Sequence, residues 1–452
     1  MKISQPSNQK AVLKTAIPGP LSTELRKRED QYIADGLQGF ALMAGIVVEK
    51  AYGNVVEDVD GNCFLDVIGG IGVNGLGHSH PKFIKAITQQ VARASVGSFT
   101  SKPRIGLFEL INKNKMFELG RLQLYSSGAE AVESALRLAK NHTGKWEIVS
   151  FSGGFHGKTH GVLGLMGSDF KNSYGPFAPG SHIVPYANCY RCPLKTTYPG
   201  CGMACVEAAR AQLKANVSKG VAAFIIEPVQ GTAGNVIPPQ EFLKAVGELA
   251  KEFDALFIAD EMITGFGRTG NYWGSQLSGV KPDIVTLGKQ FGGGFPMSGV
   301  LTTPELSKTR PWGAPSGSSS SYGGNPLGAA ASEAALTIIE EEKLVDNARE
   351  VGAYFLSKIA HYSEKYSFVG EVRGVGLMMA IEMVQDKQSK RPLSKDITNQ
   401  IFKVFLERGL LTMAYASSFR IQPSMTIDRE TVDNIVAIMN EVFDHVAATI
   451  LR

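Results

Sequence analysis

Residues 221–229 read VAAFIIEPV, and two further apolar runs, LFIADE (256–261) and DIVTLGK (283–289), follow along the chain. Short apolar runs of this kind are typical of strands that are buried on both faces of a parallel sheet. A helical pattern, PQEFLKAVGELAKEFDA (239–255), separates the first run from the second. Strands that alternate with helices predict an α/β fold, in which helices cover a mostly parallel sheet.

A charged side chain stands at or near the end of each run: Glu227, Asp260 and Lys289. Because ligands bind at the carboxyl ends of parallel strands, we expect these side chains to converge at one edge of the sheet. A lysine among apolar neighbours has a depressed pKa and can form a Schiff base. A buried aspartate can pair with a protonated heterocycle. A solvated lysine and a simple cap or ion pair are the alternatives when each residue is taken singly.

Two glycine-containing loops add groups that suit a phosphorylated aromatic ligand. In SSGAEAVE (126–133), Ser127 and Gly128 stand between a strand-like run and a helical pattern, and the N–H groups of a helix start favour phosphate. A plain capping box of Ser127 with Glu130 explains the same letters. GGFHG (153–157) offers an aromatic ring and an imidazole, with a core phenylalanine as the alternative. Phosphate loop, aromatic plate, carboxylate and lysine form the set that pyridoxal phosphate requires.

The order of the motifs makes a family resemblance explicit. From about residue 20 to its C-terminus, the chain resembles class III pyridoxal-phosphate-dependent aminotransferases of fold type I, which include the ornithine, acetylornithine and 4-aminobutyrate aminotransferases. The motifs that carry the resemblance are GVNGLGHSHP (72–81), SSGAEAVESALRLAK (126–140), FHGKTHG (155–161), IIEPVQG (225–231), DEMITGFGRTG (260–270), GKQFGGG (288–294), YGGNPLGAAA (322–331) and FRIQPSM (419–425).

The resemblance implies a role for each matching position. Lys289 would hold pyridoxal 5'-phosphate as a Schiff base and later move the substrate proton, and Asp260 would pair with the pyridinium nitrogen. Phe155 would stack on one face of the ring, and Met262 would pack on the other. The remaining cofactor contacts are assigned to Ser127, Gly128, Ala129, His156, Glu227 and Ser321. Since Ser321 matches a residue that reaches the phosphate from a partner subunit, the resemblance implies a homodimer with shared active sites.

Substrate recognition is also implied by the resemblance. Arg420 would grip a substrate carboxylate through its bidentate fork, and Gly70 and Val73 would line the substrate site. Thr232 stands where many relatives have an acidic residue that can pair with this arginine, so we expect an open carboxylate site for 2-oxoglutarate or pyruvate. Glycines at 69, 70 and 72 predict a roomy site for a long or bulky donor, such as an ω-amino acid or a diamine.

Length and composition frame these expectations. With 452 residues, the chain is expected to contain an N-terminal arm and segment that packs with the small domain (1–57), a large cofactor-binding domain (58–325) and a small α+β domain (326–452). A net charge of +4 without a basic stripe gives no reason to expect nucleic acid. Because the sequence shows neither a signal-like start nor an apolar run of about 20 residues, we expect a cytoplasmic protein without a membrane partner.

The stretch NCYRCPLKTTYPGCGMAC (188–205) holds four of the five cysteines, in the pattern C-x2-C-x8-C-x3-C. A structural metal site, a disulfide and free thiols are all open for it, and no metal ligand is assigned. The stretch lies outside every cofactor motif, so we expect an ordered loop. A metal-binding or redox-sensing protein is therefore the weaker rival to the aminotransferase. Racemases, epimerases and a decarboxylase on the same scaffold are the nearer rivals.

Overall fold

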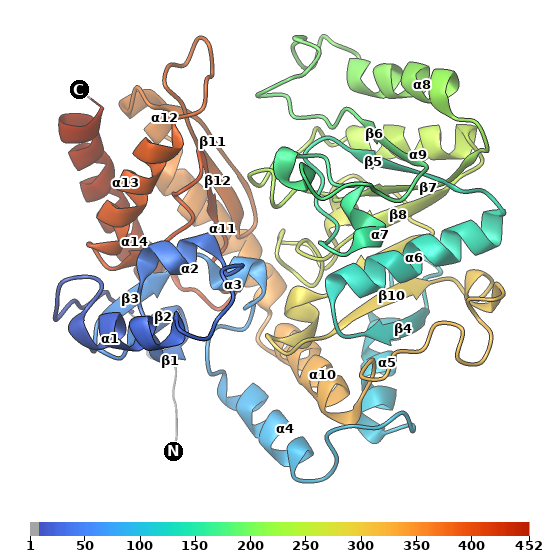
Figure 1. Ribbon diagram of the computed structural model, residues 1–452, viewed down its shortest axis with the longest axis horizontal. Helices are drawn as coiled ribbons and strands as arrows, with labels where there is room; N and C mark the ends of the chain where they lie inside the picture. Colours follow the sequence, from blue (N-terminus) through green and yellow to red (C-terminus); the bar gives the residue numbers. More distant parts are fainter. Residues whose placement is uncertain (1–8, 452) are drawn as a thin grey trace. The chain divides into compact units, whose positions relative to one another are not determined.

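The computed structural model describes residues 9–451, and the chain divides into two compact units (Figure 1). The central unit comprises Lys82–Val345. The terminal unit comprises the described residues up to Pro81 and those from Asp346 onward. The domain boundaries expected after residues 57 and 325 stay predictions. No helix among residues 9–451 is long and apolar enough to cross a membrane.

The central unit is built on a seven-stranded sheet with the order β4-β10-β9-β8-β7-β5-β6. Its strands are β4 Arg121–Tyr125, β5 Glu147–Phe151, β6 Ser181–Val184, β7 Val221–Ile226, β8 Leu256–Asp260, β9 Ile284–Leu287 and β10 Ser298–Thr302. The pairs from β6 through β9 are parallel, whereas β10 runs antiparallel to both β4 and β9. A mostly parallel sheet was predicted, and it is present.

Helices cover this sheet, as an α/β fold requires. The helices of the central unit are α4 Pro81–Val91, α5 Lys102–Lys113, α6 Gly128–Thr143, α7 His160–Leu163, α8 Ala204–Asn216, α9 Phe242–Glu252 and α10 Pro326–Glu341, with short 3-10 turns η1 Asp169–Lys171, η2 Gly274–Leu277, η3 Lys289–Gly292 and η4 Leu306–Lys308. Of these helices, α6, α8 and α9 make most of the contacts with the sheet. Helix α6 contacts more strands of the sheet than any other helix of the unit. Its residues Ala131, Ala135, Leu138 and Ala139 are fully buried. This spacing forms one apolar stripe along the helix, and Gly144 ends the helix in a left-handed conformation.

The terminal unit contains two small sheets, β1-β2-β3-β13 and β11-β12-β14. Their strands are β1 Val48–Tyr52, β2 Val55–Asp58, β3 Cys63–Asp66, β11 Val369–Val375, β12 Met378–Met383, β13 Leu410–Leu411 and β14 Ser418–Ile421. Its helices are α1 Pro20–Glu29, α2 Gly39–Ala44, α3 Gly69–Gly72, α11 Leu344–Ile359, α12 Tyr362–Lys365, α13 Lys395–Leu406, α14 Arg429–His445 and the π-helical η5 Val446–Ile450.

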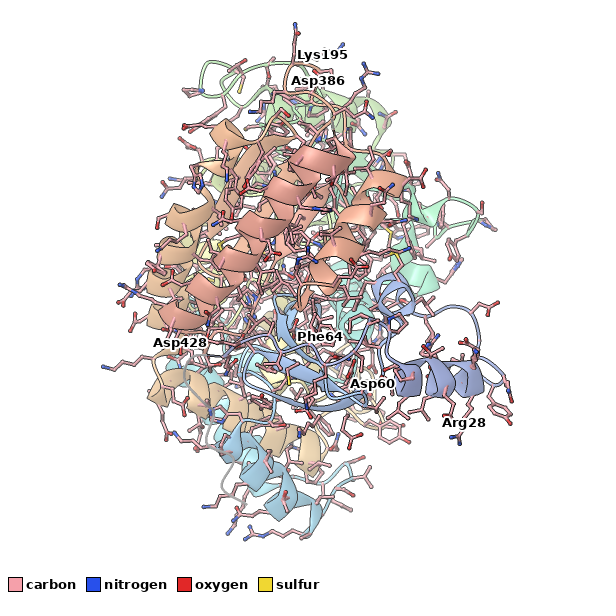
Figure 2. The ribbon with its side chains drawn as sticks, turned by 90° about the vertical axis from the view of Figure 1, so that its left-hand side faces the viewer. Arg28, Asp60, Phe64, Lys195, Asp386 and Asp428 are labelled. Atoms are coloured by element: carbon pink, nitrogen blue, oxygen red, sulfur yellow. The ribbon has the colours of Figure 1, made fainter. Side chains whose placement is uncertain are left out.

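One strand pair joins the two ends of the chain within the terminal unit. β13 pairs in parallel with β3, with Leu410 opposite Leu65. Phe64 of β3 is fully buried in a core cluster that also contains Phe402 of α13. Figure 2 shows Phe64 inside this unit, whereas Arg28 projects outward from the end of α1. Burial of one such ring contributes about 1.5–3 kcal/mol, so this pairing holds N-terminal and C-terminal segments together.

Candidate active site

Three neighbouring strands of the central unit end at the same edge of the sheet. Glu227 follows β7 directly, Asp260 is the last residue of β8, and Lys289 follows β9 after one glycine. β8 lies between the other two strands and is parallel to both. The structure therefore places the ends that carry these three residues side by side, at the edge where α/β sheets bind ligands.

Asp260 is held by three hydrogen bonds at this edge. Its Oδ2 lies 2.7 Å from Nδ1 of His156, and its Oδ1 accepts bonds from the Thr286 hydroxyl at 3.0 Å and from the Met262 N–H at 3.2 Å. Both Asp260 and His156 are buried. Because these donors come from three different segments, the carboxylate is fixed in position before any ligand binds.

The imidazole of His156 is the buried partner of Asp260, and only one of its two nitrogens contacts that carboxylate. Burial disfavours its protonated form, but the hydrogen bond with Asp260 and the negative charges of Asp260 and Glu227 raise the pKa of His156 above its ordinary value. Its buried Nε2 has no hydrogen-bond partner among residues 9–451. A buried polar atom of this kind is rare and marks a place where a partner can bind.

Glu227 shapes the neighbouring loop through its two carboxylate oxygens. Oε1 accepts a bond from the Phe155 N–H at 2.8 Å, and Oε2 accepts one from the Gly231 N–H at 3.0 Å. Burial raises the pKa of Glu227, the charge of His156 lowers it, and the charge of Asp260 adds to the rise. Glu227 thus fixes the backbone beside the half-buried ring of Phe155 and the imidazole of His156.

The start of α6 carries the predicted phosphate loop. The Ser127 hydroxyl accepts a bond from the Glu130 N–H at 3.3 Å, and the Glu130 carboxylate accepts one from the Ser126 N–H at 3.0 Å. Because the Glu130 carboxylate reaches the residue before the cap and not Ser127 itself, the predicted capping box is only half formed. It leaves the amides of Gly128 and Ala129 in the first helical turn, where N–H groups lack partners within the helix.

Met262 lies against two glycines at this edge. A Cβ added to Gly128 would lie 3.1 Å from the Met262 sulfur, and one added to Gly288 would lie 2.7 Å from it. Real Cβ atoms essentially never approach that second distance, so Gly288 allows β9 to end directly beside the buried thioether. Met262, the start of α6 and the end of β9 are thus brought together.

Lys289 follows Gly288 in an uncommon backbone conformation. Its φ is 48°, in the left-handed region, at the first residue of η3. For a residue other than glycine this conformation costs on the order of 1–3 kcal/mol and is concentrated at functional sites. The side chain is half-buried. The turn after β9 therefore holds the backbone of Lys289 in a left-handed conformation at the sheet edge.

The other predicted residues are exposed in the central unit or belong to the terminal unit. Thr232 is exposed in the loop after β7, and Ser321 is exposed before α10. In the terminal unit, Arg420 is buried on β14 opposite Ala380. Gly70 and Val73 belong to that unit as well, in α3 and directly after it.

Sequence reasoning missed three residues that position the cluster. Thr286 bonds Asp260, the Ser298 hydroxyl donates to the Ser127 carbonyl at 2.6 Å, and the Tyr186 hydroxyl donates to the Glu227 carbonyl at 3.2 Å. Of the three, only Thr286 could have been found from the sequence, because a hydroxyl inside an apolar strand needs a hydrogen-bond partner. The other two contacts depend on segments that are distant in the sequence.

The cysteine-rich stretch forms a loop between β6 and α8. Cys189, Cys192, Cys201 and Cys205 line one small cavity of about 20 Å³. None of the cysteines forms a disulfide, and no group of three or more His, Cys, Asp or Glu side chains within residues 9–451 is arranged to hold a metal ion. Lys195 of this loop points outward (Figure 2). The structure thus shows the stretch as a thiol-lined segment, and Tyr186, which also lines this cavity, connects it to Glu227.

Comparisons with known proteins place the chain in one family of enzymes. Residues 40–443 match the family model described as aminotransferase class III. The chain is 36% identical to human mitochondrial alanine–glyoxylate aminotransferase 2, over 84% of this chain and 78% of that protein. It is 33% identical to the leucine/methionine racemase of Thermococcus litoralis, over 86% and 88%, and 32% identical to the 5-aminovalerate aminotransferase of Pseudomonas putida, over 91% and 96%.

Solved structures agree with these sequence relatives. An amine transaminase from an uncultivated Pseudomonas species, solved in its PLP-bound form, has a TM-score of 0.86 and 28% identity, over 92% of this chain and 98% of that one. An (S)-enantioselective omega-transaminase from Thermomicrobium roseum has a TM-score of 0.88 and 29% identity, over 96% and 100%. The match therefore covers nearly the whole chain.

Proposed function

The chain belongs to the class III aminotransferase family, and on that premise we propose that it moves the amino group of an ω-amino acid or another long or bulky amine to 2-oxoglutarate or pyruvate. Family membership makes the chain a pyridoxal-phosphate-dependent aminotransferase. The predicted family, fold type I, enzyme class and cofactor are thereby confirmed. The donor, the acceptor and the role of each residue are proposals.

The residues of the central unit fit pyridoxal phosphate. The Asp260 carboxylate, already fixed by three donors, suits a pyridinium N–H, and the unpartnered Nε2 of His156 adds a polar atom at the same place. First-turn amides at Gly128 and Ala129 suit a phosphate. When bound, the cofactor serves as an electron sink that stabilises negative charge on the substrate carbon.

Each side chain then has a definable task. Lys289 would hold the cofactor, and its amine would accept and return the proton at the substrate carbon. Asp260 would orient the pyridine ring, with His156 hydrogen-bonded behind it. Phe155 and Met262 would hold the ring from its two faces. The observation that carries this proposal is the buried Asp260–His156 pair beside the strand end that leads to Lys289.

The terminal unit supplies the proposed substrate contacts. Arg420 binds the carboxylate of the 2-oxo acid through its planar fork, and Gly70 and Val73 face the donor. A side chain at Gly70 would meet only the Val73 side chain within 4 Å, so the space beyond this glycine is open. Relatives named for 5-aminovalerate and acetylornithine support a donor whose amine is far from its carboxylate. By the family resemblance, Thr232 stands where many relatives have an acidic residue that can pair with the carboxylate-binding arginine.

We also infer a homodimer in which Ser321 reaches the partner's phosphate site. The loop that carries this serine is anchored by the Tyr125 hydroxyl, which donates to the Ser318 carbonyl at 2.9 Å, while Ser321 itself is exposed. Light scattering of the purified protein tests the dimer. The cytoplasmic location stays a prediction, which cell fractionation would test.

The deciding experiment is a donor screen with the cofactor-loaded enzyme. ω-Amino acids, diamines and bulky amines are each paired with 2-oxoglutarate and with pyruvate, and the new amino acid is measured. We expect glutamate or alanine to form fastest from donors with a remote amine. If only α-amino acids donate, the proposed donor class is wrong although the aminotransferase assignment stands.

Racemisation is a second candidate, because a leucine/methionine racemase and an alanine/serine racemase are 33% and 32% identical to the chain. The two activities differ in their need for an acceptor. A racemase inverts an optically pure amino acid catalytically without any 2-oxo acid, whereas a transaminase without acceptor stops after one equivalent. Chiral chromatography of L-leucine and L-alanine incubated without a 2-oxo acid separates the two.

A further inference from the structure

We propose that Asp66, together with His78, holds the glycine turn, residues 69–72, in one rigid conformation and so sets which amine donors the enzyme accepts. This inference rests on the proposed function, since it names a positioning residue for the donor site. In the proposed site, Asp66 touches neither substrate nor cofactor. Its effect passes through the backbone of the glycine turn.

The glycine turn has an unusual conformation. Four consecutive residues, Gly69, Gly70, Ile71 and Gly72, have φ values of 55°, 62°, 64° and 72°. This left-handed turn includes a β-branched isoleucine, a residue type for which positive φ is a clear outlier. Such a conformation persists only where the surroundings over-determine it, and it is found mainly at functional sites.

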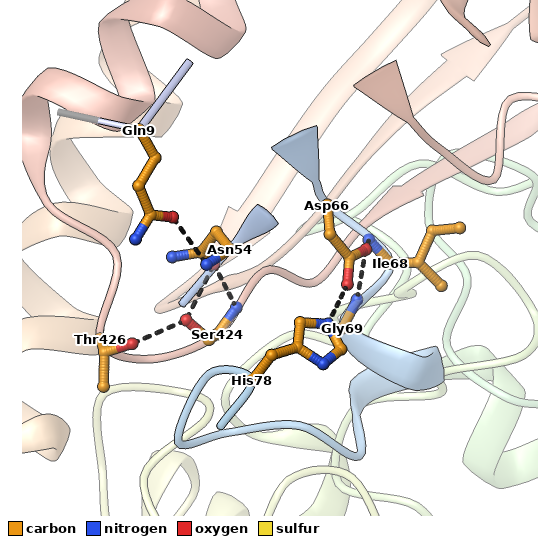
Figure 3. Close-up of polar contacts among 8 residues, drawn as sticks. All are labelled: Gln9, Asn54, Asp66, Ile68, Gly69, His78, Ser424 and Thr426. Atoms are coloured by element: carbon orange, nitrogen blue, oxygen red, sulfur yellow. Dashed lines mark hydrogen bonds and ion pairs between the residues drawn. The ribbon is translucent and has the colours of Figure 1, made fainter. Parts of the chain in front are cut away.

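Asp66 supplies much of that determination (Figure 3). Its Oδ1 accepts bonds from the Ile68 N–H at 2.8 Å and from the Gly69 N–H at 3.0 Å, while its Oδ2 lies 3.0 Å from Nε2 of His78. Asp66 is 5% exposed. His78 in turn is fixed by two backbone hydrogen bonds with Gly53, at 2.8 and 2.9 Å. One buried carboxylate thus ties the start of the turn to the far end of the same loop.

The opposite side of the glycine turn packs against the segment that follows β14. A Cβ on Gly69 would overlap the carbonyl oxygen of Gln422, and the Gln422 N–H donates to the Val67 carbonyl at 2.8 Å. Gln422 lies two residues after Arg420. Ile71 packs against the core cluster that contains Phe64. The turn is therefore built onto the strand that carries the proposed carboxylate-binding arginine.

A second polar network supports that segment (Figure 3). Asn54 Oδ1 accepts bonds from the Ser424 N–H at 3.1 Å and the Ser424 hydroxyl at 2.8 Å, and Gln9 Oε1 accepts the Asn54 N–H at 2.6 Å. The Met425 N–H donates to the Gly75 carbonyl at 2.8 Å. The turn is thus backed by a fixed segment, and the apex at Gly70 is exposed. A rigid apex without a side chain leaves space for a bulky donor. If the turn were mobile, the loop itself could move into that space.

The test compares Asp66→Ala with a matched control in the same unit. Asp58 is also buried, and its Oδ1 caps a backbone turn through the Asp60 N–H at 3.0 Å and the Asn62 N–H at 2.8 Å, but it lies in the β2–β3 hairpin. In cofactor-loaded enzyme, kcat and KM are measured for one bulky and one small donor at saturating 2-oxo acid. Hydrogen exchange of residues 68–74 reports the rigidity of the turn without any turnover.

We expect Asp66→Ala to change the ratio of kcat/KM between bulky and small donor about tenfold, mostly through KM, and to speed exchange of residues 68–74. Asp66→Asn keeps an acceptor for both amides and should restore most of the ratio, and Asp58→Ala should leave it unchanged. If Asp66→Ala does not fold, His78→Ala carries the test, since it removes one contact and should shift the ratio in the same direction.

Two results overturn the inference. In one, Asp58→Ala and Asp66→Ala change the ratio of kcat/KM between bulky and small donor equally. Both residues would then act only on the stability of the unit. In the other, Asp66→Ala speeds exchange of residues 68–74 but leaves the ratio unchanged. These results differ from failure of the proposed function, in which wild-type enzyme transfers no amino group from either donor.

Discussion

The Asp260 carboxylate and the His156 imidazole lie 2.7 Å apart, and both side chains are buried. Two charged groups in such a place stabilise the fold only as a pair, because removal of one leaves the other uncompensated. The geometry therefore links cofactor orientation to the protonation of a histidine outside the reacting atoms. Its consequences are measurable as a function of pH.

We expect His156→Gln to lower the free energy of unfolding of the cofactor-free enzyme by about 3–5 kcal/mol, the usual cost of breaking a buried pair. Because the folded-state pKa of His156 is raised, the stabilisation is fully present below the ordinary histidine value of about 6.5. It is lost as pH rises through the raised value. Denaturant titrations at several pH values should show the gap between wild type and variant narrowing toward alkaline pH. A gap that widens would contradict the pair.

Lys289→Ala should lose the visible absorbance of covalently bound cofactor and reduce turnover by about 10²–10⁴-fold or more, the range for loss of a general acid–base. The matched control is Lys281→Ala, which removes an exposed lysine just before β9. The control should keep both the absorbance and the rate. Turnover retained by Lys289→Ala would refute the assignment of this lysine.

The residues at the strand ends could be predicted from the sequence, whereas the side chains that hydrogen-bond to them could not. Glu227, Asp260 and Lys289 follow local apolar runs, and their positions at one sheet edge required only alternation of strands and helices. The bond from Thr286 to Asp260 depends on the register of β8 and β9, which no local pattern encodes. The pairing of β3 with β13 joins residues 65 and 410, so no local pattern encodes this strand pair either.

The pKa of Glu147, at the start of β5, leads us to expect that the stability of the central unit decreases in acid. Burial alone would raise its pKa, but the N–H groups of Lys219 and Ser218 and the side chain of His182 hold the pKa of Glu147 at about 2. A depressed carboxyl pKa contributes stability that is present above about 4.3, its ordinary value, and is lost as pH falls toward 2. Glu147→Gln should therefore lower Tm near neutral pH and approach wild type in acid. A constant Tm difference across this range would count against the assignment.

Thr232→Glu tests the proposed openness of the carboxylate site. A negative charge at this position should compete with the substrate carboxylate for Arg420, as the family resemblance implies, and shift preference from α-carboxylate donors toward ω-amines. Thr232→Gln is the control, because it adds the same bulk without charge. The ratio of kcat/KM for an α-amino acid and an ω-amine should change with Glu and not with Gln. Equal specificity in all three proteins would remove Thr232 from the substrate site.

Gly69 and Gly70 offer a matched pair for the glycine turn. Both have left-handed φ values, so alanine at either position costs about 1–2 kcal/mol in backbone energy. At Gly69 the new Cβ would also overlap the Gln422 carbonyl, whereas at Gly70 it would meet only the Val73 side chain at 3.5 Å. Chemical denaturation should therefore show a clearly larger loss for Gly69→Ala. Equal losses would mean that the turn can move away from Gln422, and rigid support from that side would be excluded.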